Sequence, residues 1–156
     1  MSFLFARNHA ELHNVRLSVE RISKISDRIV GVGPVGIGLD GILAMVPGVG
    51  PLYSALAGAM LVWEGVRARA SAGTLIHMSA LLVVDTLIEA PGGPIAAIFD
   101  TLFTGHKWSA NLLTKHMDET IYIEGSREAV KHRPEYADLM ARIRAGKEKR
   151  RIVFLG

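Results

Sequence analysis

Two long stretches of the chain carry almost no charge, and they dominate its predicted organisation. Residues 29–63 contain one charged side chain, Asp40, and residues 70–99 form a second apolar stretch that contains Asp85. A straight helix over the first stretch would be about 52 Å long at 1.5 Å per residue, well beyond the roughly 30 Å apolar thickness of a bilayer. The pattern therefore predicts an all-α fold whose apolar helices are embedded in a membrane and are kinked or re-entrant.

A proline–glycine element interrupts each stretch. Proline removes a backbone donor and clashes with the preceding turn, and glycine permits backbone angles that other residues avoid. An acid precedes the break in both stretches, so the order of features indicates an internal repeat of two broken helices. The breaks are formed by Pro47, Gly48 and Gly50 in the first stretch and by Pro91 and Gly92 in the second. The expected helical arms are Ile37–Val46, Leu52–Val66, Thr74–Ala90 and 95–117.

Residues 9–30 have a different pattern, that of an amphipathic helix. Apolar residues recur at steps of three and four from Leu12 to Ile29, which places them on one face, and charges occupy the other face. A basic helix of this kind can lie at a membrane interface, or it can pack against a partner in a bundle. The candidate contacts to lipid headgroups are Arg16, Arg21, Lys24 and Arg28 here, and Lys107 and Trp108 near the end of the second apolar half.

The last part of the chain is polar and is expected to be soluble. Residues 121–123 could form a short extended piece, Ser126 is a plausible helix N-cap, and Pro134 suits the first turn of a helix over 135–145. The basic cluster at 147–151 could bind headgroups or belong to a solvated terminus. The predicted parts are an amphipathic helix over 1–30, a membrane domain over 31–117 with repeats 31–69 and 70–117, and a soluble basic region over 118–156.

Composition and charge agree with a membrane setting. Apolar residues make up 49% of the chain, and its 16 glycines suit close helix packing. Ala55, Gly58 and Ala59 form a small-residue surface where another helix can approach. The net charge of +3 is concentrated near the two ends. By the positive-inside rule, both termini are expected to be cytoplasmic.

Two membrane topologies are compatible with this distribution. Two broken crossings would place Arg67 and Arg69 on the outer side, whereas two re-entrant hairpins would keep every basic cluster inside. The hairpins are therefore favoured.

Four acids lie within or at the edge of the apolar arms. An ionised carboxylate at the centre of a bilayer costs roughly 2.5–3.5 kcal/mol on insertion scales, so such groups usually pair, neutralise or line a wet path. They could cap the broken helix ends, handle an ion or proton, or pair with Arg28 or Lys107. Two close acids on one helix face would raise one pKa, as in proton sites. The acids are Asp40, Asp85, Glu89 and Asp100.

The sequence contains no recognisable catalytic constellation. It has no cysteine, which excludes disulfides and thiolate metal sites. His9 and His13 are four residues apart, but no third metal ligand is evident. Residues 31–36 match the G-x-G-x-x-G pattern, but a charged helix precedes them and Pro34 lies inside, so a dinucleotide site is rejected. We expect no enzyme activity, no cofactor and no metal.

The segment Leu39-Asp40-Gly41-Ile42-Leu43-Ala44-Met45-Val46-Pro47-Gly48-Val49-Gly50 resembles the L-D-x-x-x-G-x-x-P-G-x-G-D core of an uncharacterised bacterial family, "domain of unknown function 4112". Residues 99–103 and 107–111 are similar to its later F-x-x-x-F-K-x-N-like stretch. The resemblance covers roughly residues 20–115 and implies a small membrane-associated helical protein, with no activity or cofactor. Pro51 and Pro94 stand where the family pattern has acids after the breaks. This difference favours a capping role for the acids before them.

The expected function is that of a small, non-catalytic protein of the bacterial inner membrane. It would act as a homo-oligomer or as an accessory subunit of a membrane complex, with membrane lipids as partners and no nucleic acid. One alternative is an oligomeric channel or carrier for ions or small solutes that uses Asp40 and Asp85. The other is a soluble helical domain that binds a protein partner.

Overall fold

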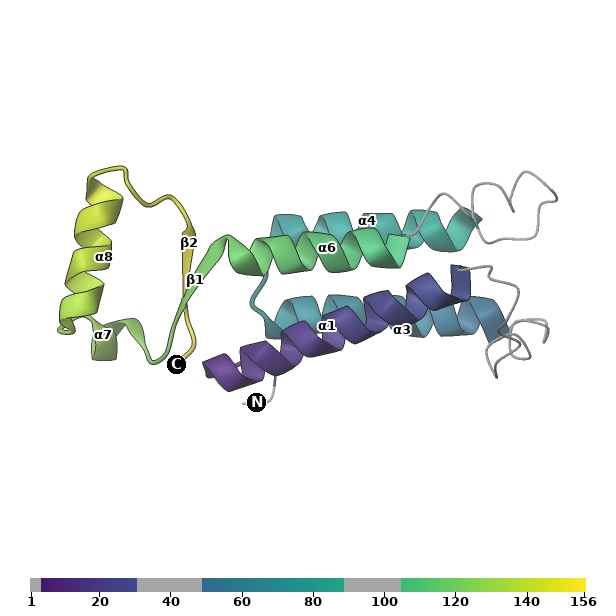
Figure 1. The fold of residues 1–156 in the computed structure, drawn as a ribbon, viewed down its shortest axis with the longest axis horizontal. Coiled ribbons are helices and arrows are strands. Elements are labelled where there is room, and N and C mark those ends of the chain that lie inside the picture. Colours follow the sequence, from purple (N-terminus) through teal and green to yellow (C-terminus); the bar gives the residue numbers. More distant parts are fainter. Residues whose placement is uncertain (1–3, 31–48, 89–104) are drawn as a thin grey trace.

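In a computed structural model, four long helices form an up-and-down bundle, and a small module follows at one end (Figure 1). The structure describes residues 4–30, 49–88 and 105–156, with the side chains of residues 4–24, 55–84 and 105–156. The bundle consists of α1 (His9–Val30), α3 (Val49–Arg67), α4 (Ala72–Ile88) and α6 (Gly105–Asp118).

Each bundle helix runs antiparallel to the helix that follows it (Figure 1). The amide of Ala6, just before α1, donates to the carbonyl of Arg67 at the end of α3, at 2.9 Å. The amide of Ser71, between α3 and α4, donates to Nε2 of His116 near the end of α6, at 3.2 Å. The start of α1, the α3–α4 connector (residues 68–71) and the end of α6 therefore meet at one end of the bundle.

The chain thus reverses direction between α1 and α3 and again between α4 and α6. Gly50 lies in α3 and Asp85 lies in α4. The other predicted break residues and acids lie outside the described residues; they are Asp40, Pro47, Gly48, Glu89, Pro91, Gly92 and Asp100.

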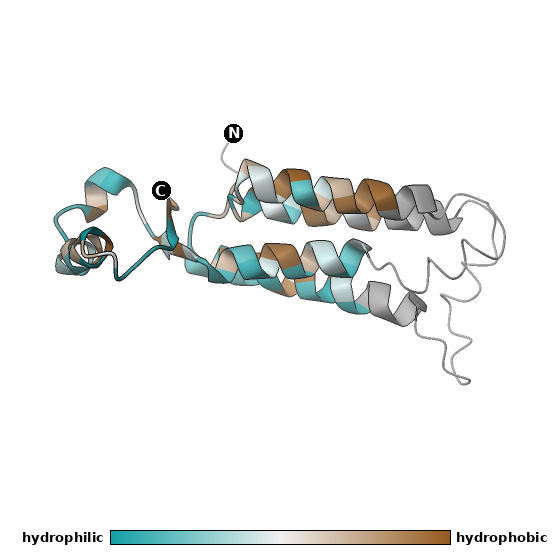
Figure 2. Cartoon of the chain, turned by 90° about the horizontal axis from the view of Figure 1, so that it is seen from above, coloured by the Kyte–Doolittle hydropathy of each residue, from teal (hydrophilic) through white to brown (hydrophobic). Residues whose placement is uncertain are grey.

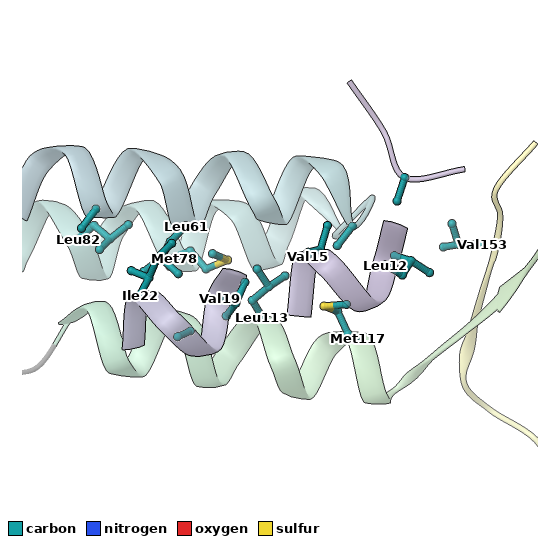
Figure 3. Close-up of a cluster of buried hydrophobic side chains, with 14 of the residues drawn as sticks. Leu12, Val15, Val19, Ile22, Leu61, Met78, Leu82, Leu113, Met117 and Val153 are labelled. Carbon is teal, nitrogen blue, oxygen red and sulfur yellow. The ribbon is translucent and has the colours of Figure 1, made fainter. Parts of the chain in front are cut away.

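Helix α1 has the bounds that its periodicity predicts. Its N-terminus is capped by Asn8, whose side-chain oxygen accepts from the amide of Glu11 at 2.8 Å, while its side-chain nitrogen donates to the Glu11 carboxylate at 3.3 Å. The apolar face of α1 is buried against the other helices (Figure 3). Of the two interpretations of this face, packing within a bundle is therefore the one observed.

The core lies between the four helices (Figure 3). Helices α3 and α4 correspond to the arms expected over 52–66 and 74–90, shifted by one to three residues at their ends. The longest fully buried side chains in the bundle are those of Leu61, Met78 and Leu113. The core side chains labelled in Figure 3 are Leu12, Val15, Val19, Ile22, Leu61, Met78, Leu82, Leu113, Met117 and Val153.

Glycines allow α3 and α4 to approach closely. A Cβ atom on Gly65 would lie 2.8 Å from Cδ2 of Leu75, and one on Gly58 would lie 3.3 Å from Cδ2 of Leu82. Gly58 therefore lies at the contact between α3 and α4. Ala55 and Ala59 instead lie on the exposed side of α3.

Substituting Gly65 with leucine is expected to destabilise the bundle. The new side chain must enter the space of Leu75, and overpacking of this kind costs about 1–3 kcal/mol. Thermal unfolding should show a Tm lower by about 3–10 °C. The matched variant is Gly73→Leu in the first turn of α4, where the nearest atom to an added Cβ is 4.0 Å away. Its Tm should stay unchanged or rise, and equal losses in both variants would contradict the close contact.

Residues 120–156 form the C-terminal module. Strand β1 (Thr120–Ile123) pairs in parallel with β2 (Arg151–Phe154), with Ile121 opposite Ile152. Between them lie α7 (Arg127–Val130), capped by Ser126, and α8 (Pro134–Arg144), with proline in its first turn. The predicted extended piece, cap and second helix are confirmed.

The all-α prediction needs one correction at β2. The sequence pattern predicts no strand after the basic cluster at 147–151, but Arg151–Phe154 form one. The described residues form six helices and a two-stranded parallel sheet, so the fold is mostly helical rather than all-α. The β-branched pair Ile152-Val153 suits a strand. The strand also needs a partner, however, and β1 lies about 30 residues earlier in the chain, so the local sequence does not identify the pairing.

Candidate functional site

One outer side of the bundle is apolar and solvent-exposed. Helices α3 and α4 form one layer, with α1 and α6 in the other, and brown apolar residues are most frequent in the α3–α4 layer (Figure 2). Large side chains at helical spacing on both helices are 44–67% exposed. We call this surface the apolar face; it comprises Leu56, Met60, Trp63, Ile76, Val83 and Val84.

The apolar face carries no formal charge from acidic or basic side chains. No Asp, Glu, Lys or Arg occurs in residues 49–63 or 72–84. His77 is exposed on α4. Large apolar side chains that are exposed together on one side of a protein typically mark a contact with a membrane or a protein.

The outer side of the α1–α6 layer is polar. Arg21 and Lys24 are exposed on α1, and Lys107 and Lys115 are exposed on α6. Teal, hydrophilic residues are frequent in this layer (Figure 2). The bundle therefore has two outer sides of opposite character.

The second notable region is the junction, where the α3–α4 connector meets the C-terminal module. Arg69 has a left-handed backbone (φ 51°). Its guanidinium donates to the carbonyl of Phe154 at 2.8 Å and lies over the ring of Phe5, 5.2 Å from the ring centre. In return, the guanidinium of Arg151 donates to the carbonyl of Arg69 at 2.8 Å. The two arginines thus join the connector and β2 in both directions.

His116 lies at the centre of the junction. Its Nε2 is 3.2 Å from the amide nitrogen of Ser71 and 3.1 Å from Nη1 of Arg151. Its Nδ1 is 3.1 Å from Oγ1 of Thr74. Partial burial lowers the pKa of His116, Arg151 lowers it further, and Glu119 opposes both effects.

Further contacts hold the module and its loops. The Tyr122 hydroxyl donates to the carbonyl of Ala68 at 2.9 Å, and burial raises the pKa of this hydroxyl. Hydrogen bonds from Arg150 hold the pKa of Glu148 at about 2. Sequence patterns did not predict these contacts, because the partners are identified only by the tertiary fold.

The expected headgroup residues are distributed along the α1–α6 layer rather than gathered in one place. Arg16 forms an ion pair with Asp118 of α6. Arg21 and Lys24 are exposed farther along α1. Lys107 and Trp108 are exposed in the first turn of α6, away from the junction (Figure 1). Arg28 belongs to α1, but its side chain is not among those described.

Two expectations concern metals and membrane crossing. Within residues 4–30, 49–88 and 105–156, no three His, Cys, Asp or Glu side chains are grouped so that they could hold a metal ion. His9 and His13 are both exposed. In the same ranges, no helix combines the length and apolar character needed to span a bilayer.

The fold and these surfaces define an up-and-down four-helix bundle with one exposed apolar side and an appended α/β module. The family model described as "Domain of unknown function (DUF4112)" matches residues 15–117, more than half of the 156 residues. The chain belongs to this family, as its motifs indicated. No curated protein and no solved structure matches the chain.

Proposed function

We propose that this chain is a non-catalytic membrane protein that inserts its α3–α4 layer into the lipid bilayer and leaves the α1–α6 layer facing water. Within the membrane it would serve as a small accessory or self-associating subunit. The observation that carries the proposal is the apolar face, whose large side chains are exposed without any charge among them.

The energetics of the apolar face favour lipid as its occupant. Complete burial of one large apolar side chain contributes about 1.5–3 kcal/mol, so six half-exposed side chains offer on the order of 5–9 kcal/mol. The segments 31–48 and 89–104 add apolar residues next to the same helices in the sequence. Exposed lysines and arginines on the other layer complement anionic headgroups and water.

The chain direction supports re-entrant hairpins over two crossings. Two crossings would put the α3–α4 connector at the opposite end from the start of α1. Instead, Ala6 is hydrogen-bonded to Arg67 at the connector. Insertion of one bundle layer needs no helix that crosses the bilayer. It keeps both termini and the basic junction on one side, which the positive-inside rule assigns to the cytoplasm.

Single introduced cysteines test this proposal directly, because the natural chain contains none. Ile76→Cys and Val83→Cys on the apolar face would each carry a polarity-sensitive fluorophore. In vesicles that contain spin-labelled lipid, both labels should be quenched and their emission should shift to the blue. The matched variants Asn14→Cys and Asn111→Cys, exposed on the other layer, should stay unquenched.

Two outcomes would overturn the proposal. Equal quenching of all four labels would contradict the assigned orientation. Recovery of the full-length protein in a soluble fraction without detergent, together with unquenched labels at Ile76 and Val83, would favour a protein partner as the occupant of the apolar face.

A further inference from the structure

His116 joins three parts of the molecule that are far apart in the sequence. Its ring contacts Ser71 in the connector, Thr74 in the first turn of α4 and Arg151 in β2. Because α6 leads directly into β1, His116 also lies next to the point where the module leaves the bundle (Figure 1). The state of this one ring therefore bears on how the module is held.

The contacts of His116 fix its protonation state. A backbone amide and a guanidinium can only donate, so the Nε2 atom that faces both of them must be an acceptor. The proton of the neutral ring then lies on Nδ1 and points to Oγ1 of Thr74. Oγ1 of Thr74 is in turn 2.8 Å from Oγ of Ser71, which completes the network. Only a neutral His116 satisfies every one of these contacts.

We propose that His116 is a pH-sensitive latch: the neutral ring holds the C-terminal module against the connector, and its protonation releases the module. A proton on Nε2 would face two donors and would place a second positive charge beside Arg151. Both contacts at Nε2 must then separate. Repulsion from the charged ring moves Arg151, which also donates to the carbonyl of Arg69, so the junction loses two of its anchors together. The bonds from Arg69 and Tyr122 are then too few to keep the module in one position, and it moves at the α6–β1 connection.

The charged surroundings decide the direction of the pH dependence. Arg151 faces His116 from β2, Glu119 faces it from α6, and Tyr122 of β1 lies under the influence of the same Arg151. The connector and α4 face the ring with the neutral groups of Ser71 and Thr74, and the connector also carries the charged Arg69, whose guanidinium is held at the carbonyl of Phe154. The lowering of the pKa by burial and by Arg151 is larger than the rise that Glu119 causes. The pKa of His116 is therefore lower in the closed state, in which the module is held against the connector, than in the open state, in which the module is released.

A lowered pKa means that the closed state is fully favoured above about pH 6.5 and becomes less favoured as the pH falls through the open-state pKa. The loss continues down to the pKa of the closed state. One proton changes the closing equilibrium by at most about tenfold per pH unit. This inference is independent of the membrane proposal, because it concerns contacts within one chain.

Distance measurements between two spin labels can test the latch in the full-length protein in mild detergent. One label would be placed at Asn111→Cys on α6 and the other at Ala141→Cys on α8, both exposed sites. At about pH 7.5 a single narrow distance distribution is expected. At about pH 5 a second, broader population should appear. An unchanged distribution between these pH values would overturn the proposal.

Three variants test whether the pH response arises from His116 or from other groups that become protonated at low pH. His116→Gln keeps an acceptor that does not titrate, so the single distance should persist at both pH values. His116→Lys carries a permanent charge and should show the second population at both. His132→Gln changes an exposed histidine of the module and should keep the pH response of the natural protein. A full pH response in His116→Gln would contradict the latch, even if His116→Lys failed to fold.

Discussion

Replacing Leu61 with alanine is expected to lower the free energy of unfolding by about 2–5 kcal/mol. Leu61 is 0% exposed and lies at the centre of the bundle core, where Met78 and Leu113 are also fully buried (Figure 3). The substitution removes buried apolar surface and leaves a cavity that four packed helices can close only in part. Denaturant unfolding followed by circular dichroism in mild detergent would measure the loss.

The control for this effect lies on the same helix. Leu56 is 59% exposed, so Leu56→Ala should change the free energy of unfolding by about 0.5 kcal/mol or less. Equal losses for the two variants would show that the assigned burial on α3 is wrong. The pair therefore tests which side of α3 faces the core, and thereby which side is left for another partner.

The combined substitution Ile76→Lys and Val83→Lys is expected to abolish membrane association. A lysine near the centre of an inserted helix costs about 2.5–3.5 kcal/mol, and less near the interface. A combined cost of at least about 3 kcal/mol corresponds to a roughly 100-fold lower partition constant between vesicles and water, and hence to a much lower vesicle-bound fraction. Co-sedimentation with vesicles would measure this fraction.

A matched double variant tests whether the loss of binding depends on where the two lysines are placed or only on the added charge. Asn14→Lys and Asn111→Lys add the same two charges to exposed sites on the other layer. Their vesicle-bound fraction should stay the same, or rise on anionic lipid. If both double variants lost binding equally, the apolar face would not be the membrane contact.

Local patterns in the sequence predicted the helices well. The apolar steps from Leu12 to Ile29 predicted the extent of α1, and the members of this series from Leu12 to Ile22 are buried. The continuous apolar runs placed α3 and α4 to within a few residues, because proline, glycine and the polar residues 67–71 end them. Ser126 and Pro134 marked the starts of α7 and α8 through backbone preferences that need no distant partner.

Features that depend on distant residues could not be predicted in the same way. The contact between His116 and Arg151 joins residues 35 apart, and the bond between Arg69 and Phe154 joins residues 85 apart. Neither histidine nor arginine is unusual in its own sequence neighbourhood. The exposure of Ala55, Ala59 and His77 depends on which side of each helix packs against the bundle. An apolar run in which polar residues do not recur at a regular spacing does not identify that side.

The junction also has a consequence for the order of assembly. The carbonyls of Ala68 and Arg69 that receive Tyr122 and Arg151 come into place only when the turn between α3 and α4 has formed. Contacts between residues 54 and 82 apart in the chain form late, because a long loop must close first. The last strand can therefore dock only onto a helical hairpin that is already complete. Closure of the module thus follows the pairing of α3 with α4.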